Sequence, residues 1–270
     1  MKNIRDLPLP KFTHPPVDEV VVGLQFESIP NYTSAVSGEV WSLFKAEYPK
    51  VEEHHLLPPT YETFGGLNPT GSVQFSFGPA PAKTRLWFVS DDESHLIQFQ
   101  HDRLVSNWRK RSQGNNYPHY DQIVQKYADY FAKLDGLIQK YSVSGLSANQ
   151  SEVTYVNIIP VASFSELSDW LNVSVPESVE FETVGLNYSQ TLKSAEGLPV
   201  ARLYADLKSV YVESSPREKA IKLSLTAKGA PSGADLHSCL SFLSFCHEHI
   251  VWHFSDLCTD QANKKWGRYK

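Results

Sequence analysis

The sequence predicts an α+β fold in which a unit of one strand, one helix, three strands and a second helix occurs twice. Three observations predict it. Short segments alternate apolar and polar residues, which is typical of antiparallel sheets covered on one face by helices. Two long segments, 120–141 and about 235–264, follow helical spacing. The order of elements repeats on either side of a Ser- and Gly-containing break near residue 145.

The first half opens with a polar, proline-rich segment, residues 1–16, which we expect to be an extended arm. The β-branched run at 20–27 predicts a strand, which Pro30 ends. Helical spacing over 34–48 predicts a helix, which Pro49 stops. After a loop rich in Pro and Gly, we expect three strands and a long helix, at 73–77, 85–90, 96–101 and 120–141.

The second half repeats this order. We expect a strand, a short helix, three strands and a closing helix, at 152–161, 164–171, 183–191, 201–212, 220–227 and about 235–264. The domain organisation is then an arm (1–16), a first half (17–145) and a second half (146–270), with the halves packed as one unit. By analogy, two merged halves are similar to TATA-binding-protein-like or helix-grip architectures.

Composition limits the class of protein. The chain has 270 residues, 41% of them hydrophobic, and a net charge of −5, so we expect a folded core and no dedicated DNA coat protein. The three cysteines lie near the C-terminus and predict small buried side chains rather than a disulfide framework. The sequence shows neither an apolar signal core nor a run of about 20 apolar residues. We therefore expect a cytoplasmic protein without a membrane span.

The block at 98–111 offers the best candidate site. On a strand, alternation puts Gln98, Gln100 and Asp102 on one face and Arg103 on the other. Amides and a carboxylate suit a ligand pocket, and a cationic cluster beside a tryptophan suits phosphate or single-stranded nucleic acid. The candidate ligand-binding residues are Gln98, Gln100, Asp102, Arg103, Asn107, Trp108, Arg109 and Arg111.

The same block has a simpler structural interpretation. The polar row is then the solvated face of an antiparallel sheet. Asp102 and Arg103 form an ion pair or a cap, and Trp108 packs on the core. No base or nucleophile is identifiable beside Asp102, so we predict no catalytic residue.

Histidines on the closing helix raise the question of a metal. Helical spacing puts Cys246, His249 and His253 in one arc, while His247 falls on the apolar stripe. No nearby segment offers an evident fourth ligand, so we predict hydrogen-bonded core histidines and no metal. Motifs for nucleotide hydrolysis, dinucleotide binding and zinc fingers are absent from the sequence, so we predict no cofactor.

Five blocks of the sequence form a recognisable pattern: PPVDEV at 15–20, LIQFQHDRLVSNW at 96–108, TYVNIIP at 154–160, CHEHIVWHF at 246–254 and WGR at 266–268. Together they resemble a sporadically distributed family of uncharacterised bacterial proteins. The resemblance covers nearly the whole chain and implies a bacterial or phage-borne protein, of the kind found in defence and toxin–antitoxin loci. It brings no established catalytic residues. Val153 departs from the pattern, because an Arg-rich strand is expected there.

Three functions remain open. We favour a non-enzymatic binding or regulatory protein with a protein partner encoded nearby or a second copy of itself, such as a component of a bacterial defence or toxin–antitoxin locus. The second is a small-ligand or nucleotide-sensing protein. The third is a nuclease or phosphotransfer enzyme without a standard motif, in which Asp102, Arg103 and His101 would be tested first. Nucleic acid is a further candidate partner.

Overall fold

The protein is built from strands and helices in an order that repeats along the chain. The computed structural model describes residues 7–65, 84–111, 116–142, 145–176, 179–212 and 218–269. The first half contains β1 (Lys11–Phe12), β2 (Val17–Phe26), α1 (Ser34–Phe44), β3 (Lys50–His54), β4 (Arg85–Val89), β5 (His95–Gln100), β6 (Arg103–Arg109) and α2 (Tyr120–Ile138). The second half contains β7 (Ala148–Pro160), η1 (Phe164–Glu166), α3 (Leu167–Trp170), β8 (Gly185–Lys193), β9 (Pro199–Val212), β10 (Glu218–Gly229), α4 (Leu236–Leu257), α5 (Asp260–Lys265) and β11 (Arg268–Tyr269).

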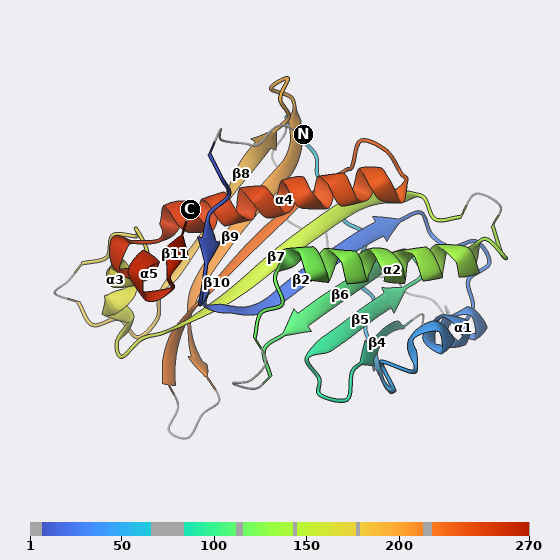
Figure 1. Ribbon diagram of the computed structural model, residues 1–270, viewed down its shortest axis with the longest axis horizontal. Coiled ribbons are helices and arrows are strands. Elements are labelled where there is room, and N and C mark those ends of the chain that lie inside the picture. The colour runs from blue at the N-terminus through green and yellow to red at the C-terminus, as the bar shows by residue number, and fades with distance from the viewer. Residues whose placement is uncertain are drawn as a thin grey trace, which may run out of the picture.

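Nine strands of the described residues form one antiparallel sheet, ordered β3-β4-β5-β6-β2-β7-β10-β9-β8 (Figure 1). The first long strands of the two halves, β2 and β7, pair at its centre, with Val22 opposite Val153. Outward from them, β6, β5 and β4 follow on one side and β10, β9 and β8 on the other. The α+β prediction is confirmed, and the two halves share one topology, to which the first half adds β3. The likeness to TATA-binding-protein-like or helix-grip architectures stays a prediction.

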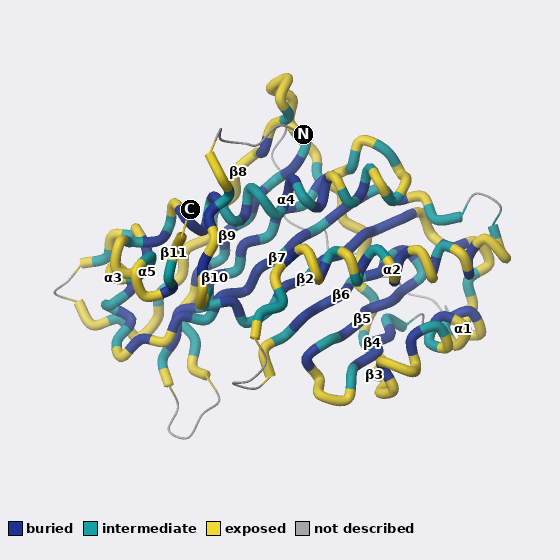
Figure 2. Tube along the Cα trace, in the orientation of Figure 1, coloured by how far each residue is buried: buried dark blue, intermediate teal, exposed yellow. Residues whose placement is uncertain are grey.

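Two long helices, α2 and α4, cover one face of this sheet (Figure 1). Their inner sides bury Tyr127 and Leu134 from α2 and Cys246 and Ile250 from α4 against the central strands. Burial is concentrated in those strands, whereas β8 at the sheet edge is mostly exposed (Figure 2). All three cysteines are buried free thiols, as predicted. Within the described ranges, no helix has the length and apolar character needed to cross a membrane.

The arm and the C-terminal residues meet in a small second sheet. β1 pairs antiparallel with β11, and Lys11 lies opposite Tyr269. The ring of Phe12 packs edge-on against Phe254 of α4, with 5.4 Å between ring centroids. Residues 7–16 of the predicted arm are therefore docked against α4 rather than projecting from the fold.

Several boundaries differ from the prediction. Residues 103–109, which are not among the predicted strands, form β6, and β3 lies in a segment expected to be a loop. The predicted closing helix is two helices, because the Thr259 hydroxyl accepts a hydrogen bond from the Ala262 N–H at 3.1 Å and caps a new one. The strand predicted at 73–77 lies outside the described residues.

Candidate functional site

The face of the sheet opposite α2 and α4 carries polar side chains, and we call it the polar face. Residues that are partners in neighbouring strands point to the same side of a sheet, so the strand register defines this set. Its members include Gln25, Gln98, Gln100, Arg103, Asn107, Gln150, Arg202, Tyr204 and Lys228.

Arg103 lies on the same face as Gln100, so its predicted position on the opposite face is wrong. β5 ends at Gln100, His101 and Asp102 form the turn, and Arg103 stands directly opposite Gln100. Strict alternation does not continue through a tight two-residue turn. The Asp102 carboxylate accepts a hydrogen bond from Gln100 Nε2 at 2.6 Å and lies 3.5 Å from Arg103 Nε. This is the ion pair of the structural interpretation.

Gln98 and Asn107 belong to a second polar network. Gln98 accepts a hydrogen bond from Arg85 Nη1 at 3.0 Å and donates one to Asn107 Oδ1 at 2.9 Å. Asn107 in turn donates to Glu19 at 2.7 Å. The amides at these two positions are therefore hydrogen-bonded to residues of the same chain.

The remaining three candidate residues lie at the end of β6 and just beyond it. Trp108 faces the helices and is buried, with its ring 5.6 Å from that of Tyr117. Arg109 donates a hydrogen bond to the backbone oxygen of Glu93, and Arg111 is exposed beyond the end of β6. Arg109 stands opposite Glu19 and shares the polar face with Arg103 and Asn107. The structure thus brings six of the eight candidates to this face and its turn, and separates Trp108 and Arg111 from them.

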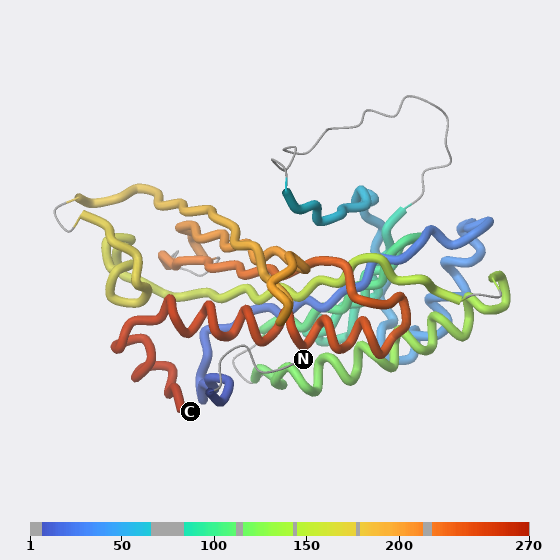
Figure 3. Tube along the Cα trace, turned by 90° about the horizontal axis from the view of Figure 1, so that it is seen from above, coloured from blue at the N-terminus to red at the C-terminus, as the bar shows by residue number. Residues whose placement is uncertain are grey.

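Residues 55–65, which we call the strap, cross the polar face (Figure 3). Gln100 accepts from the Leu57 N–H at 3.0 Å and donates to the Leu57 carbonyl at 2.9 Å. Gln25 accepts from the Thr60 N–H at 2.9 Å, and Gln150 accepts from the Glu62 N–H at 3.4 Å. Three glutamines on three strands therefore bind the backbone of the strap.

Glu62 fixes the far end of the strap. Its side chain is 4% exposed, and its carboxylate accepts hydrogen bonds from Arg202 Nε at 2.9 Å and from the Tyr204 hydroxyl at 2.7 Å. Lys228 Nζ lies 3.5 Å from the same carboxylate. Arg202 also donates to the carbonyl of Thr63 at 2.7 Å. The polar face therefore binds a carboxylate with two cations and a hydroxyl.

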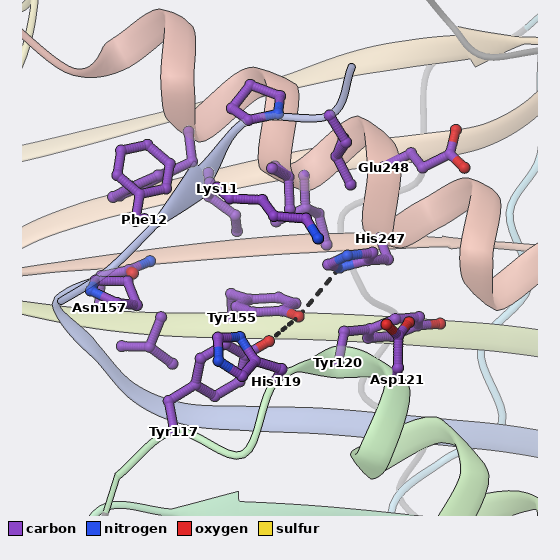
Figure 4. Close-up of a pocket in the computed structure, with 18 of the residues that line it drawn as sticks. Lys11, Phe12, Tyr117, His119, Tyr120, Asp121, Tyr155, Asn157, His247 and Glu248 are labelled. Carbon is purple, nitrogen blue, oxygen red and sulfur yellow. Dashed lines mark hydrogen bonds between the residues drawn. The ribbon is translucent and has the colours of Figure 1, made fainter. Parts of the chain in front are cut away.

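A pocket of about 570 Å³ lies on the helix side of the sheet (Figure 4). Arm residues 9–12, the start of α2, the middle of β7 and the middle of α4 line it. These segments are far apart in the sequence, so the pocket exists only in the folded chain.

One wall of the pocket is a chain of hydrogen bonds. The hydroxyl oxygens of Tyr117 and Tyr155 are 2.8 Å apart, and the Tyr155 hydroxyl lies 3.0 Å from Nδ1 of His247 (Figure 4). The donors and acceptors of these hydrogen bonds can be ordered in either direction. If Nδ1 accepts, Tyr117 donates to Tyr155 and Nε2 carries the proton; if Nδ1 donates, both hydroxyls turn and Nε2 becomes an acceptor.

Stacking fixes the ring orientation of His247, and burial fixes its protonation state. Its ring lies parallel to that of Tyr120, with 3.8 Å between centroids and 3° between planes. His247 keeps some accessible surface, yet desolvation lowers its pKa to about 3. Burial also raises the pKa of Tyr117, Tyr120 and Tyr155 above the usual value. All four rings are therefore uncharged near neutral pH.

Sequence reasoning finds only part of this pocket. It predicts His247 as a hydrogen-bonded helix residue, and the bond to Tyr155 confirms this. It misses the tyrosines, although Tyr155 falls on the core side of its strand and Tyr120 on the apolar stripe of its helix. A tyrosine hydroxyl on a buried face needs a polar partner, and that requirement is the signal that could have linked Tyr155 to His247.

Cys246, His249 and His253 have separate surroundings. The Tyr188 hydroxyl in β8 lies 2.7 Å from Nε2 of His253. The ring of His249 packs edge-on against Phe245 at 4.4 Å, and Cys246 is buried. The arc seen in the sequence is therefore divided among different contacts.

No protein-family model matches the chain, and no curated protein matches it at a significant level. The function is therefore argued from the polar face and the pocket.

Proposed function

We propose that this protein is a non-enzymatic binding protein that holds a small planar ligand in the pocket between its arm, α2, β7 and α4. The wall of that pocket carries the proposal, because Tyr120 stacks on His247 beside a hydrogen-bonded pair of tyrosines. Its volume of about 570 Å³ suits a small molecule, since ligand pockets span roughly 300–1,000 Å³. The proposal joins the binding and ligand-sensing roles predicted from the sequence.

The pocket favours a ligand with an aromatic ring and an uncharged polar group. The Tyr120 and His247 rings offer edges and faces for stacking. Among the described residues, none hydrogen-bonds to Nε2 of His247, and this nitrogen can donate or accept. Lys11, Asp121 and Glu248 bring charges of both signs, so we expect no strong selection for an ionic ligand. Nucleobases and nucleosides fit these features better than nucleotides.

The same groups favour binding over acid–base catalysis. A general base works best when its pKa lies near the working pH, and burial lowers the pKa of His247 to about 3. Burial raises the pKa of Tyr117 and Tyr155, so neither hydroxyl gives up its proton readily. This supports a role in which the pocket holds its ligand without changing it.

We expect Tyr155→Phe to weaken ligand binding about tenfold, because it removes one hydrogen bond and uncouples Tyr117 from His247. Wild-type protein is first screened by thermal shift against nucleobases, nucleosides, cyclic nucleotides and flavins. The affinity of the best compound is then measured by titration calorimetry on both proteins.

Tyr188→Phe is the matched control, since it removes a hydroxyl from a second Tyr–His pair, Tyr188 with His253, outside the pocket. It should leave the affinity unchanged. A screen in which no compound raises the melting temperature contradicts the proposal. So does a ligand whose affinity survives both Tyr155→Phe and His247→Phe.

The resemblance to the bacterial family, the protein partner and the link to a defence or toxin–antitoxin locus stay predictions. A ligand-binding pocket is compatible with each of them and depends on none. Purification of the tagged protein with its neighbouring gene products would test the partner directly.

A further inference from the structure

The strap contacts the polar face through its backbone. Side-chain amides of Gln100, Gln25 and Gln150 bind backbone groups at Leu57, Thr60 and Glu62. These bonds do not depend on the side chains of the strap. Any extended chain with the same backbone path could satisfy them, which is how peptide-binding surfaces gain affinity for backbone.

One side chain of the strap is recognised specifically. Arg202 and Lys228 form ion pairs with Glu62, and among the described residues neither has another carboxylate partner. Removing the strap would leave two cations and the Tyr204 hydroxyl together on β9 and β10. The uncovered surface would therefore attract an acidic side chain.

Apolar burial contributes little to holding the strap. Leu57 is 38% exposed and Tyr61 is 58% exposed, whereas Leu56 and Phe64 are half-buried. The Phe64 ring packs against Arg202, whose guanidinium carbon lies 5.4 Å from the ring centroid. Its attachment rests mainly on polar contacts, and each of these adds little net stability because water competes for the same groups. Beneath it lies a cavity of about 330 Å³ bordered by Arg85, Gln98 and Val105. The strap thus leaves space that another segment could fill.

We infer that the polar face is a docking surface for an extended acidic segment of a partner protein, and that the strap occupies this surface as an internal stand-in. A partner that supplies the backbone groups and the carboxylate would reproduce the contacts of the strap. A partner with a larger side chain over the cavity would bury more surface and displace it. The inference concerns the face of the sheet opposite the pocket and does not depend on the ligand proposed there.

A peptide with the sequence of residues 55–65 tests this in trans. Labelled peptide is titrated into full-length Glu62→Ala protein and into wild type, and binding is followed by fluorescence anisotropy. We expect at least about tenfold tighter binding to Glu62→Ala, because the wild-type strap competes at the high effective concentration of a tethered segment. A peptide with glutamine in place of the glutamate should bind about tenfold more weakly.

Two further variants test the position of the site in the Glu62→Ala protein. Arg202→Gln should abolish peptide binding, whereas Lys208→Gln, which changes another cation on the same face of β9, should not. Equal binding to Glu62→Ala and wild type, or equal binding of the two peptides, overturns the inference.

Hydrogen exchange on wild type supplies a test that needs no variant. If the strap opens locally, the amides of Leu57, Thr60 and Glu62 should exchange roughly 100-fold faster than those of β2 and β7. If these three amides exchange only as fast as the central strands, the strap does not leave the face and the inference fails.

Discussion

Replacing Trp108 with alanine is expected to lower the free energy of unfolding by about 3–5 kcal/mol. The side chain is 2% exposed and lies on the helix side of β6, among the largest fully buried side chains of the core. Its removal leaves a cavity between the sheet and the helices that rigid neighbours can fill only in part. Urea unfolding followed by circular dichroism measures the change.

Tyr61→Ala is the control for this experiment. The ring of Tyr61 is 58% exposed on the strap, so its loss should change the free energy of unfolding by less than about 0.5 kcal/mol. The alternative to a core role for Trp108 is the ligand-binding role that the sequence also allows. If Trp108→Ala is as stable as wild type but loses nucleic-acid or ligand binding, the result would support that role and contradict the core assignment.

Between pH 7 and pH 4, wild type is expected to lose about 3 kcal/mol more of its free energy of unfolding than His247→Phe. Burial lowers the pKa of His247 from the ordinary 6.5 to about 3. The unfolded chain therefore binds the proton first. The contribution of His247 is complete above pH 6.5 and is lost as the pH falls toward 3. Urea unfolding at half-unit pH steps, for both proteins, measures the difference.

His253→Phe provides the comparison for the pH experiment. Burial lowers the pKa of His253 as well, but its side chain is only half-buried, so the difference from wild type should be smaller. If the curves of wild type and His247→Phe run parallel from pH 7 to pH 4, water reaches the His247 ring. That result would contradict the conclusion that the pocket wall is uncharged.

Much of the fold could be predicted because local patterns decide it. The stripe on 120–141 and the alternation in the later strands depend only on near neighbours in the sequence. The repeated order of elements predicted two similar halves, and the strand order on either side of the β2–β7 pair agrees with that prediction. Prediction failed where a tight turn reset the alternation, as it did between Gln100 and Arg103.

The sites were harder to predict because they depend on distant contacts. Gln25, Gln100 and Gln150 stand on three strands, and nothing in their local sequences shows that one segment crosses all of them. The stack of Tyr120 on His247 joins two helices, and the two residues are more than one hundred positions apart in the sequence. Spacing along the chain carries no information about such pairs.

The pairing of β2 with β7 has a consequence for synthesis on the ribosome. β2 pairs with β6 soon after its own half has been translated, but its other edge must wait for β7, whose Val153 pairs with Val22. At translation rates of about 5–20 residues per second, the wait from the end of β6 to the end of β7 lasts about 3–10 seconds. During it, the nascent chain presents an unprotected apolar strand to other chains. Chaperone demand during translation should therefore be greatest before residue 160 emerges.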